Sequence, residues 1–175
     1  MKTQDLLDLI ERDWARERPD IDTTAQLTVI GIQRLSALLD HELETFFAPF
    51  DLTPSSFDVL ATLRRSAPRE GLPFSRLSAL MAITPPAVTK RVDLLAVRGL
   101  VERQAHPDDR RTMLVRLTDT GRDLADRALT LHVANEERLL QGLTLLEGAQ
   151  LRVLVGKFAA HLEETLQLGT DAAGG

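Results

Sequence analysis

The chain has 175 residues, of which 43% are hydrophobic and 27% are charged, a composition typical of a folded globular protein. It has no cysteine, which excludes disulfides, thiolate metal sites and cysteine nucleophiles, and its four histidines lack ligand-like spacing. No apolar run reaches the roughly 18 residues of a membrane span, and charged residues fill the start of the chain, where a signal peptide needs an apolar stretch. We therefore expect a cytoplasmic protein without a bound metal or cofactor.

The net charge of −5 is unevenly distributed along the chain. Residues 53–116 hold 11 Lys and Arg against 6 Asp and Glu, whereas the rest of the chain holds 10 against 20. Because nucleic-acid binding depends on local potential and not on total charge, a basic central module between acidic flanks is compatible with DNA binding.

The N-terminal segment, residues 1–52, predicts two helices. A short amphipathic helix is expected over residues 3–18, ending before Pro19, from the apolar stripe Leu6, Leu7, Ile10 and Trp14. A longer helix follows residues 22–24, which offer capping oxygens, and its apolar periodicity continues until Pro49.

The central segment, residues 53–117, has the pattern of a winged helix-turn-helix domain. Thr53 followed by Pro54 opens a helix that extends to about Ser66. Two short helices, residues 75–81 and 84–98, form a helix-turn-helix, and Gly99 ends the second one. Residues 100–105 and 112–117 form a β-hairpin, the wing. The fold class expected is mainly α with a small β-hairpin wing.

The C-terminal segment, residues 118–168, returns to helical periodicity on both sides of a break at Gly142. These helices are too apolar for isolated arms, so we expect them to form a dimerisation region, and the tail, residues 169–175, to be disordered. The candidate interface or core residues are Leu139, Leu140, Leu143, Leu146, Leu151, Leu154, Val155, Phe158 and Leu162.

The helix over residues 84–98 is the candidate DNA-reading element. Val88, Val92 and Leu95 recur at helical spacing and should face the core. Pro86, Thr89 and Lys90 therefore point outward, and small, hydroxyl and cationic side chains near a helix N-terminus suit the major groove. The alternative interpretation is an ordinary solvated polar face.

The tip of the hairpin holds two adjacent arginines, Arg110 and Arg111, beside two aspartates. A guanidinium at such a tip suits the negative potential of the minor groove, and an ion pair with Asp109 can hold the Arg111 side chain extended. Solvated charges at a turn are the alternative.

The order of these elements, with the motifs Pro107-Asp108-Asp109-Arg110-Arg111 and Leu117-Thr118-Asp119-Thr120-Gly121, resembles the MarR family of transcriptional regulators. The resemblance covers nearly the whole chain. It implies a triangular homodimer built by the terminal helices, with the helix over residues 84–98 in the major groove of double-stranded DNA and Arg111 in the minor groove. His106 departs from the pattern, because many members have an acidic residue there.

Within the family the chain resembles the urate-responsive branch, that of the HucR and PecS type. The features that support this resemblance are the extra N-terminal helix and the residues Trp14, Asp58, Arg65, Arg91 and Arg103. The resemblance implies that these residues bind an anionic heteroaromatic effector such as urate, although relatives with similar residues answer to other small anions.

The same residues fit an anion site on physical grounds. Arg91 lies at the edge of the apolar stripe of its helix, so it should be half-buried and need an anionic partner, for which Asp58 is a candidate. Arg65 adds positive charge, and Trp14 can stack on a flat ring. The alternatives are that Trp14 only anchors its helix, that Asp58 and Arg91 form a structural ion pair, and that Arg103 contacts a DNA phosphate.

These observations predict a ligand-responsive repressor that binds a palindromic operator as a homodimer and is released by a small planar anion such as urate. A constitutive DNA-binding module without an effector, or a regulator answering to another small organic anion, remains open. An enzyme is disfavoured because the sequence has no Gly-rich phosphate loop, no Ser/His/Asp set and no recognisable pair of catalytic carboxylates.

Overall fold

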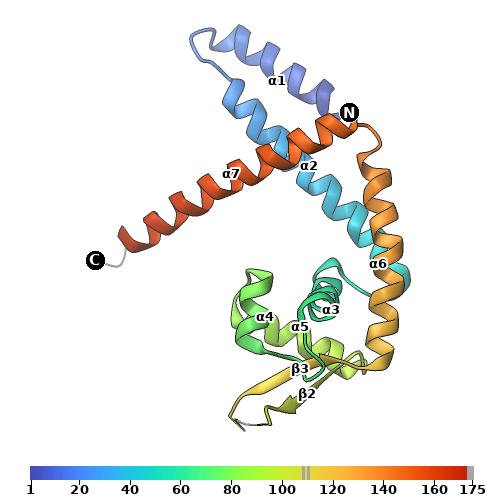
Figure 1. Cartoon of the computed structure of the whole chain (residues 1–175). Helices are drawn as coiled ribbons and strands as arrows, with labels where there is room; N and C mark the ends of the chain where they lie inside the picture. Colours follow the sequence, from blue (N-terminus) through green and yellow to red (C-terminus); the bar gives the residue numbers. More distant parts are fainter. Residues whose placement is uncertain (108, 110, 173–175) are drawn as a thin grey trace. The chain divides into compact units, whose positions relative to one another are not determined.

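The computed structural model describes residues 1–107, 109 and 111–172, with side chains described up to residue 165 (Figure 1). It separates into two compact units, Met1–Leu129 and Thr130–Gly175, which are described separately. The order of helices and strands in the first unit is that of a winged helix-turn-helix domain preceded by two helices. The predicted fold class, mainly α with a small wing, is confirmed.

The first unit begins with α1 (Thr3–Glu17) and α2 (Thr24–Phe47), which lie side by side. Arg34 Nε donates a hydrogen bond to Thr3 Oγ1 at 3.5 Å across the pair. At position 31 of α2, a Cβ would lie 3.7 Å from Leu7 Cδ1, an ordinary van der Waals distance, so the two helices are close together here. The stripe that predicts α1 therefore packs on α2, and none of its residues is fully buried.

The winged helix-turn-helix domain starts after η1 (Ala48–Phe50) and contains α3 (Pro54–Ser66), α4 (Phe74–Met81) and α5 (Pro85–Val97). Thr53 Oγ1 accepts a hydrogen bond from the Ser56 amide at 3.1 Å, which confirms the predicted start of α3. Gly99 follows α5 with a φ of +67°, a conformation that glycine adopts without strain.

The wing is a three-stranded antiparallel sheet with the strand order β1-β3-β2. The predicted hairpin forms β2 (Val101–Ala105) and β3 (Met113–Leu117), which pair from Val101 opposite Leu117 to Ala105 opposite Met113. The third strand, β1 (Leu72–Pro73), pairs with Leu114 and Val115 of β3. Two residues show no alternating pattern, so the sequence did not predict β1.

One core holds the three helices against the inner face of the wing. Its largest fully buried side chains are Phe47, Val59, Leu60, Leu63, Leu77, Val88, Val92, Leu95 and Val115. Phe47 and Phe57 stack with ring centroids 4.6 Å apart, which attaches the end of α2 to α3. Burying aliphatic and aromatic side chains of this size is the main stabilising contribution to such a domain.

Two long helices complete the chain, α6 (Asp119–Leu140) and α7 (Leu145–Ala172). The first turns of α6 belong to the first unit, where Arg64 of α3 pairs with Asp126 at 2.7 Å. The helix α7 continues to Ala172, so residues 169–172, which we expected in a disordered tail, are helical, and residues 173–175 lie outside the described residues. Its side chains Leu151, Leu154, Val155, Phe158 and Leu162 are exposed in the single chain. Among the described residues, no helix is both long and apolar enough to cross a membrane.

Candidate nucleic-acid interface and effector site

The orientation of the DNA-reading face of α5 is set by the buried side chains on the opposite face of the helix. Val88, Val92 and Leu95 are at most 1% exposed and point into the core, as the spacing predicts. Thr84 precedes α5 with an extended backbone, and Pro85 and Pro86 occupy the first helical turn, where a missing amide hydrogen costs nothing. The outward face is therefore held rigidly and close to the helix N-terminus.

That outward face contains a shallow groove, here called the α5 groove, lined by Pro85, Pro86, Thr89, Lys90, Asp93, Leu94 and Val97. Pro86, Thr89 and Lys90 are all exposed in it. Thr89 Oγ1 donates to the Pro85 carbonyl at 3.1 Å, so the hydroxyl hydrogen is used inside the helix. The side chain is left with an acceptor lone pair and a methyl group to present outward, and a methyl group is the partner that thymine offers in the major groove.

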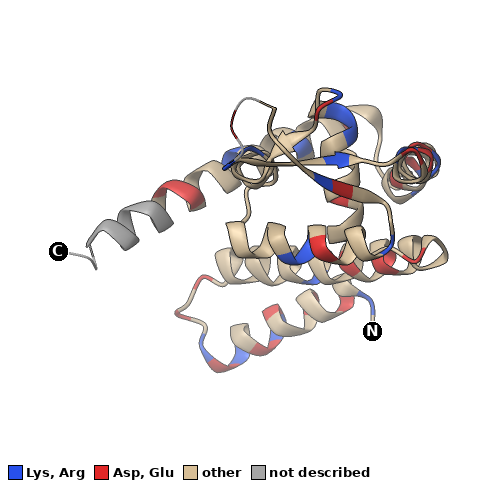
Figure 2. Cartoon of the chain, turned by 90° about the horizontal axis from the view of Figure 1, so that it is seen from below, with Lys and Arg blue, Asp and Glu red and all other residues tan. Residues whose placement is uncertain are grey.

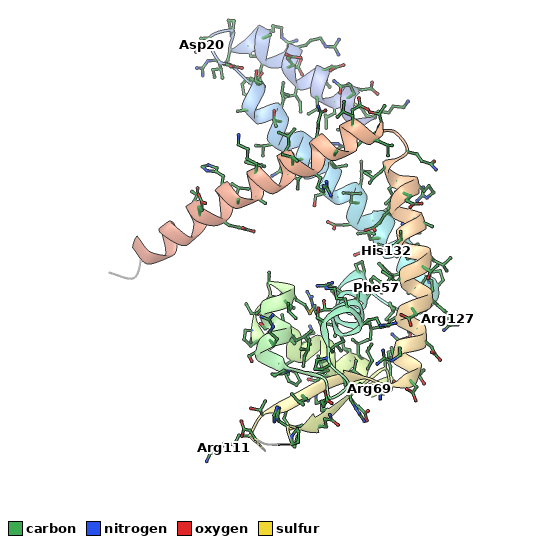
Figure 3. All side chains as sticks on the ribbon, viewed as in Figure 1. Asp20, Phe57, Arg69, Arg111, Arg127 and His132 are labelled. Carbon is green, nitrogen blue, oxygen red and sulfur yellow. The ribbon has the colours of Figure 1, made fainter. Side chains whose placement is uncertain are left out.

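The wing tip carries Arg111, whose side chain is exposed and lies at the far end of the hairpin (Figure 3). Asp109 accepts a hydrogen bond from the Arg111 amide at 3.0 Å and one from Thr112 Oγ1 at 2.7 Å. These donors, the Thr112 hydroxyl first, hold the pKa of Asp109 below its usual value. Arg110 lies outside the described residues, so its predicted contact with DNA stays a prediction.

Asp109 orders the tip in a different way from the one expected. The sequence suggests an ion pair between Asp109 and the Arg111 guanidinium, whereas the carboxylate bonds to the main chain of Arg111. Within the described part of the tip, no ion pair involves the Arg111 side chain. A short aspartate closes a turn more readily than it reaches a long neighbouring side chain. The guanidinium is left available for an external anion.

The distribution of charge distinguishes the wing domain from the N-terminal helix. Figure 2 shows acidic residues along the whole of α1, with basic residues only in its C-terminal half. On α1, Arg16 bonds to its neighbours Asp13 and Glu17 at 3.4 and 2.9 Å. The basic excess of the chain lies instead in residues 53–116. A surface that neutralises phosphates therefore belongs to the wing domain and not to α1.

The five predicted effector residues come from four elements. Trp14 lies on α1 and is 37% exposed, Asp58 and Arg65 lie on α3, Arg91 lies on α5, and Arg103 lies on β2. Arg91 is half-buried, as its position beside the apolar stripe predicts. In the described part of the chain, no hydrogen bond or ion pair joins Trp14, Asp58, Arg65 and Arg91 to one another. The ion pair considered for Asp58 and Arg91 is thus not formed in the single chain.

Arg103, and not Arg91, is the predicted effector residue that forms an ion pair with a carboxylate. Its Nη2 forms an ion pair with Asp93 Oδ1 on α5, and its guanidinium lies over the Phe74 ring, 5.1 Å from the ring centroid. Neither Asp93 nor Phe74 was predicted as a site residue. Helical spacing places Asp93 on the outward face, but its partner is in the strand that follows, and only the packing of the hairpin on α5 brings the two together.

Comparison with known proteins gives the class of this chain. The model of the MarR family matches residues 50–112, from the last residue of η1 to the wing tip. The chain is 37% identical over 154 residues to the HTH-type transcriptional regulator PecS of Dickeya dadantii, covering 87% of this chain and 92% of that protein. The chain belongs to the MarR family of transcriptional regulators. It is therefore a DNA-binding regulator and not an enzyme.

Solved structures of MarR-family proteins agree in fold. A variant of Escherichia coli MarR complexed with operator DNA has a TM-score of 0.67 and 26% identity, covering 83% of this chain and 96% of that chain. CouR of Rhodococcus jostii RHA1, bound to p-coumaroyl-CoA, has a TM-score of 0.65 and 28% identity, covering 75% and 91%. Homologues of this MarR-family chain thus include one solved with operator DNA and one solved with p-coumaroyl-CoA.

Proposed function

We propose that this MarR-family regulator is a homodimeric repressor that leaves its operator when a small planar anion such as urate binds. The effector site is formed by Trp14, Asp58, Arg65, Arg91 and Arg103. The observation that supports it is the ion pair between Arg103 and Asp93, because it places a cation of the effector site in direct contact with the DNA-reading helix. An anion that binds Arg103 therefore affects the DNA-binding surface directly, because no other residue lies between Arg103 and the DNA-reading helix.

The DNA-binding form displays two groups of residues to one duplex. Pro86, Thr89 and Lys90 enter the major groove, and Arg111 with Arg110 enters the adjacent minor groove. Residues 1–52 and 118–168 act as the dimerisation scaffold of the domain at residues 53–117. The exposed apolar side chains of α7 support this assignment, because a face of this kind is usually covered by a partner. Two-fold symmetry then requires a palindromic operator with half-sites about one helical turn apart.

An effector of this kind needs only a modest difference in affinity between the two states of the protein. A coupling free energy of about 1–3 kcal/mol lowers DNA affinity by roughly 5- to 150-fold. Two or three guanidinium groups and a tryptophan fit a flat ring with a delocalised negative charge better than they fit a neutral ring. The relative PecS supports the choice of this branch, and the bound p-coumaroyl-CoA of CouR supports an organic anion as the class of effector.

The test is a titration of the protein–DNA complex with urate, followed by fluorescence anisotropy of a labelled duplex. The duplex is selected from random-sequence DNA by the wild-type protein, which avoids assuming an operator. We expect urate to release the DNA, and hypoxanthine, a neutral purine of similar shape, to have no effect. If millimolar urate leaves the affinity unchanged, urate is rejected; if a panel of other aromatic anions also has no effect, the constitutive DNA-binding module is the better description.

A further inference from the structure

We propose that Asp93 is the residue that converts effector binding into loss of DNA affinity, by placing a negative charge on the DNA-reading surface once Arg103 is withdrawn. The inference deepens the proposed function and rests on it for the effector. The part that concerns Asp93, Arg103 and DNA rests only on the contacts of the chain and on the DNA binding of its family.

Asp93 has an unfavourable position for a DNA-binding protein. It lines the α5 groove together with Thr89 and Lys90, and it is the one acidic side chain among the residues that line that groove. Residues three apart on a helix are neighbours on one face, so Asp93 and Lys90 share the outward face of α5. A free carboxylate there repels phosphates and the acceptor atoms of guanine and thymine in the major groove.

Arg103 neutralises this carboxylate from the wing. Its ion pair with Asp93 Oδ1 joins β2 to α5, and the Phe74 ring supports its guanidinium from the start of α4. On the opposite strand Arg103 faces Val115, which is fully buried, so the backbone at this point of the hairpin is fixed by the core. With the pair formed, the α5 groove has the single net positive charge of Lys90; without it, Asp93 cancels that charge.

The pair is open to competition. The side chains of Arg103 and Asp93 are 35% and 53% exposed, so an anion from solvent can reach the guanidinium. An ion pair this exposed contributes little to folding stability, and exchanging one anionic partner of Arg103 for another therefore has little effect on the fold. The exchange acts on the DNA-reading surface instead. An anion on Arg103 leaves Asp93 without its partner, facing the duplex.

The chain offers a matched control one residue away. Glu102 of β2 pairs with Arg116 of β3 at 2.7 Å, and the two side chains are 47% and 41% exposed. Successive residues of a strand point to opposite faces, so Glu102 lies on the face of the wing away from Arg103. The two ion pairs are alike in exposure and share a strand, but only the Arg103 pair reaches α5.

The first experiment measures DNA affinity without any effector, by fluorescence anisotropy on the selected duplex. We expect Arg103→Ala to bind DNA at least fivefold more weakly, Asp93→Asn to bind as tightly as the wild type or tighter, and the double variant Asp93→Asn/Arg103→Ala to recover most of the loss. Arg103→Lys, which keeps the charge, should retain most of the affinity, and Glu102→Gln should leave it unchanged. Circular dichroism of each variant checks that it is folded.

Three results would overturn the proposal. The first is an Arg103→Ala variant that is folded and binds DNA normally, because Asp93 would then not need neutralising. The second is a double variant no better than Arg103→Ala, since the loss would then come from a missing phosphate contact of Arg103. The third is a loss of affinity in Asp93→Asn, which would mean that the carboxylate reads a base, as aspartate can do at the amino group of cytosine.

The second experiment adds urate and separates this inference from the proposed function. We expect Asp93→Asn to bind urate in isothermal titration calorimetry and to remain on DNA, with the urate-dependent loss of affinity reduced at least fivefold relative to Glu102→Gln. A full urate response in Asp93→Asn would contradict the role of Asp93 and leave the effector assignment intact. If urate has no effect on the wild type, the effector assignment fails, and the first experiment still decides the role of Asp93.

Discussion

Gly121 of α6 lies against the main chain of Leu100, so close that a Cβ at position 121 would come 1.8 Å from the Leu100 carbonyl oxygen. Thr118, three residues earlier, donates from its hydroxyl to the Gly99 carbonyl at 2.7 Å, and the same hydroxyl oxygen accepts from the Gly121 amide at 3.0 Å. The Leu-Thr-x-x-Gly motif is thus the joint that attaches the start of α6 to the beginning of the wing.

Gly121→Ala should destabilise the protein, because neither the Leu100 main chain nor α6 can move away without disturbing this joint. We expect the free energy of unfolding to fall by about 2 kcal/mol or more, at the upper part of the range for overpacked positions. Urea denaturation followed by circular dichroism measures it. Gly142→Ala is the matched control, since a Cβ at position 142 meets nothing within 4 Å, and an equal effect of the two substitutions would contradict this account.

Thr118→Val should remove both hydrogen bonds of the joint while keeping the shape of the side chain. Loss of a capping hydroxyl typically costs about 1 kcal/mol, so the thermal midpoint should fall by a few degrees. Thr118→Ser keeps the hydroxyl and should retain most of the stability, and Thr120→Val, on an exposed residue of the same helical turn, should change little. A Thr118→Val variant as stable as Thr118→Ser would show that the hydroxyl is not needed.

Asp109 should titrate below the usual aspartate value of 3.8, because the Thr112 hydroxyl and the Arg111 amide donate to its carboxylate in the folded turn. A lowered pKa in the folded state means that the ionised turn is favoured above 3.8 and that this contribution is lost as the pH falls through the lowered value. Carbon-detected NMR titration of Asp109 measures the pKa directly. In Asp109→Asn, the NMR chemical shift of the Arg111 amide should no longer change with pH in this range. A wild-type pKa at or above 3.8 would contradict the two hydrogen bonds to the Asp109 carboxylate.

Phe158→Glu should weaken the dimer, because it places a charge among the exposed apolar residues of α7. Analytical ultracentrifugation at micromolar concentration should show dimers for the wild type and mainly monomers for the variant. Lys157→Glu, a charge change at the neighbouring position, controls for net charge alone. If the wild type sediments as a monomer, or if Phe158→Glu stays fully dimeric, the assignment of α7 to the interface is wrong.

The sequence predicts most of the helices because their signals are local. Thr53 and Pro54 mark the start of α3, Gly99 marks the end of α5, and the spacing of Val88 and Val92 gives the buried face of α5. The Asp93–Arg103 pair has no local signal, because helical periodicity says only that Asp93 points outward. Its partner is found only when β2 packs on α5. Asp58 was considered as the partner of Arg91 for the same reason: the sequence indicates which side chains are charged and outward, but not which elements pack together.

The measurement that tests the DNA-binding surface most directly is the affinity of Lys90→Ala and Arg111→Ala for the selected duplex as a function of salt. Each substitution should weaken binding roughly tenfold, or about 1.4 kcal/mol. The double variant should also reduce the steepness of the salt dependence, because released counterions scale with the cations at the interface. Arg16→Ala on α1, also exposed but paired within its own helix, should behave as the wild type. Wild-type affinity and salt dependence in Lys90→Ala/Arg111→Ala would contradict the claim that α5 and the wing tip bind the duplex.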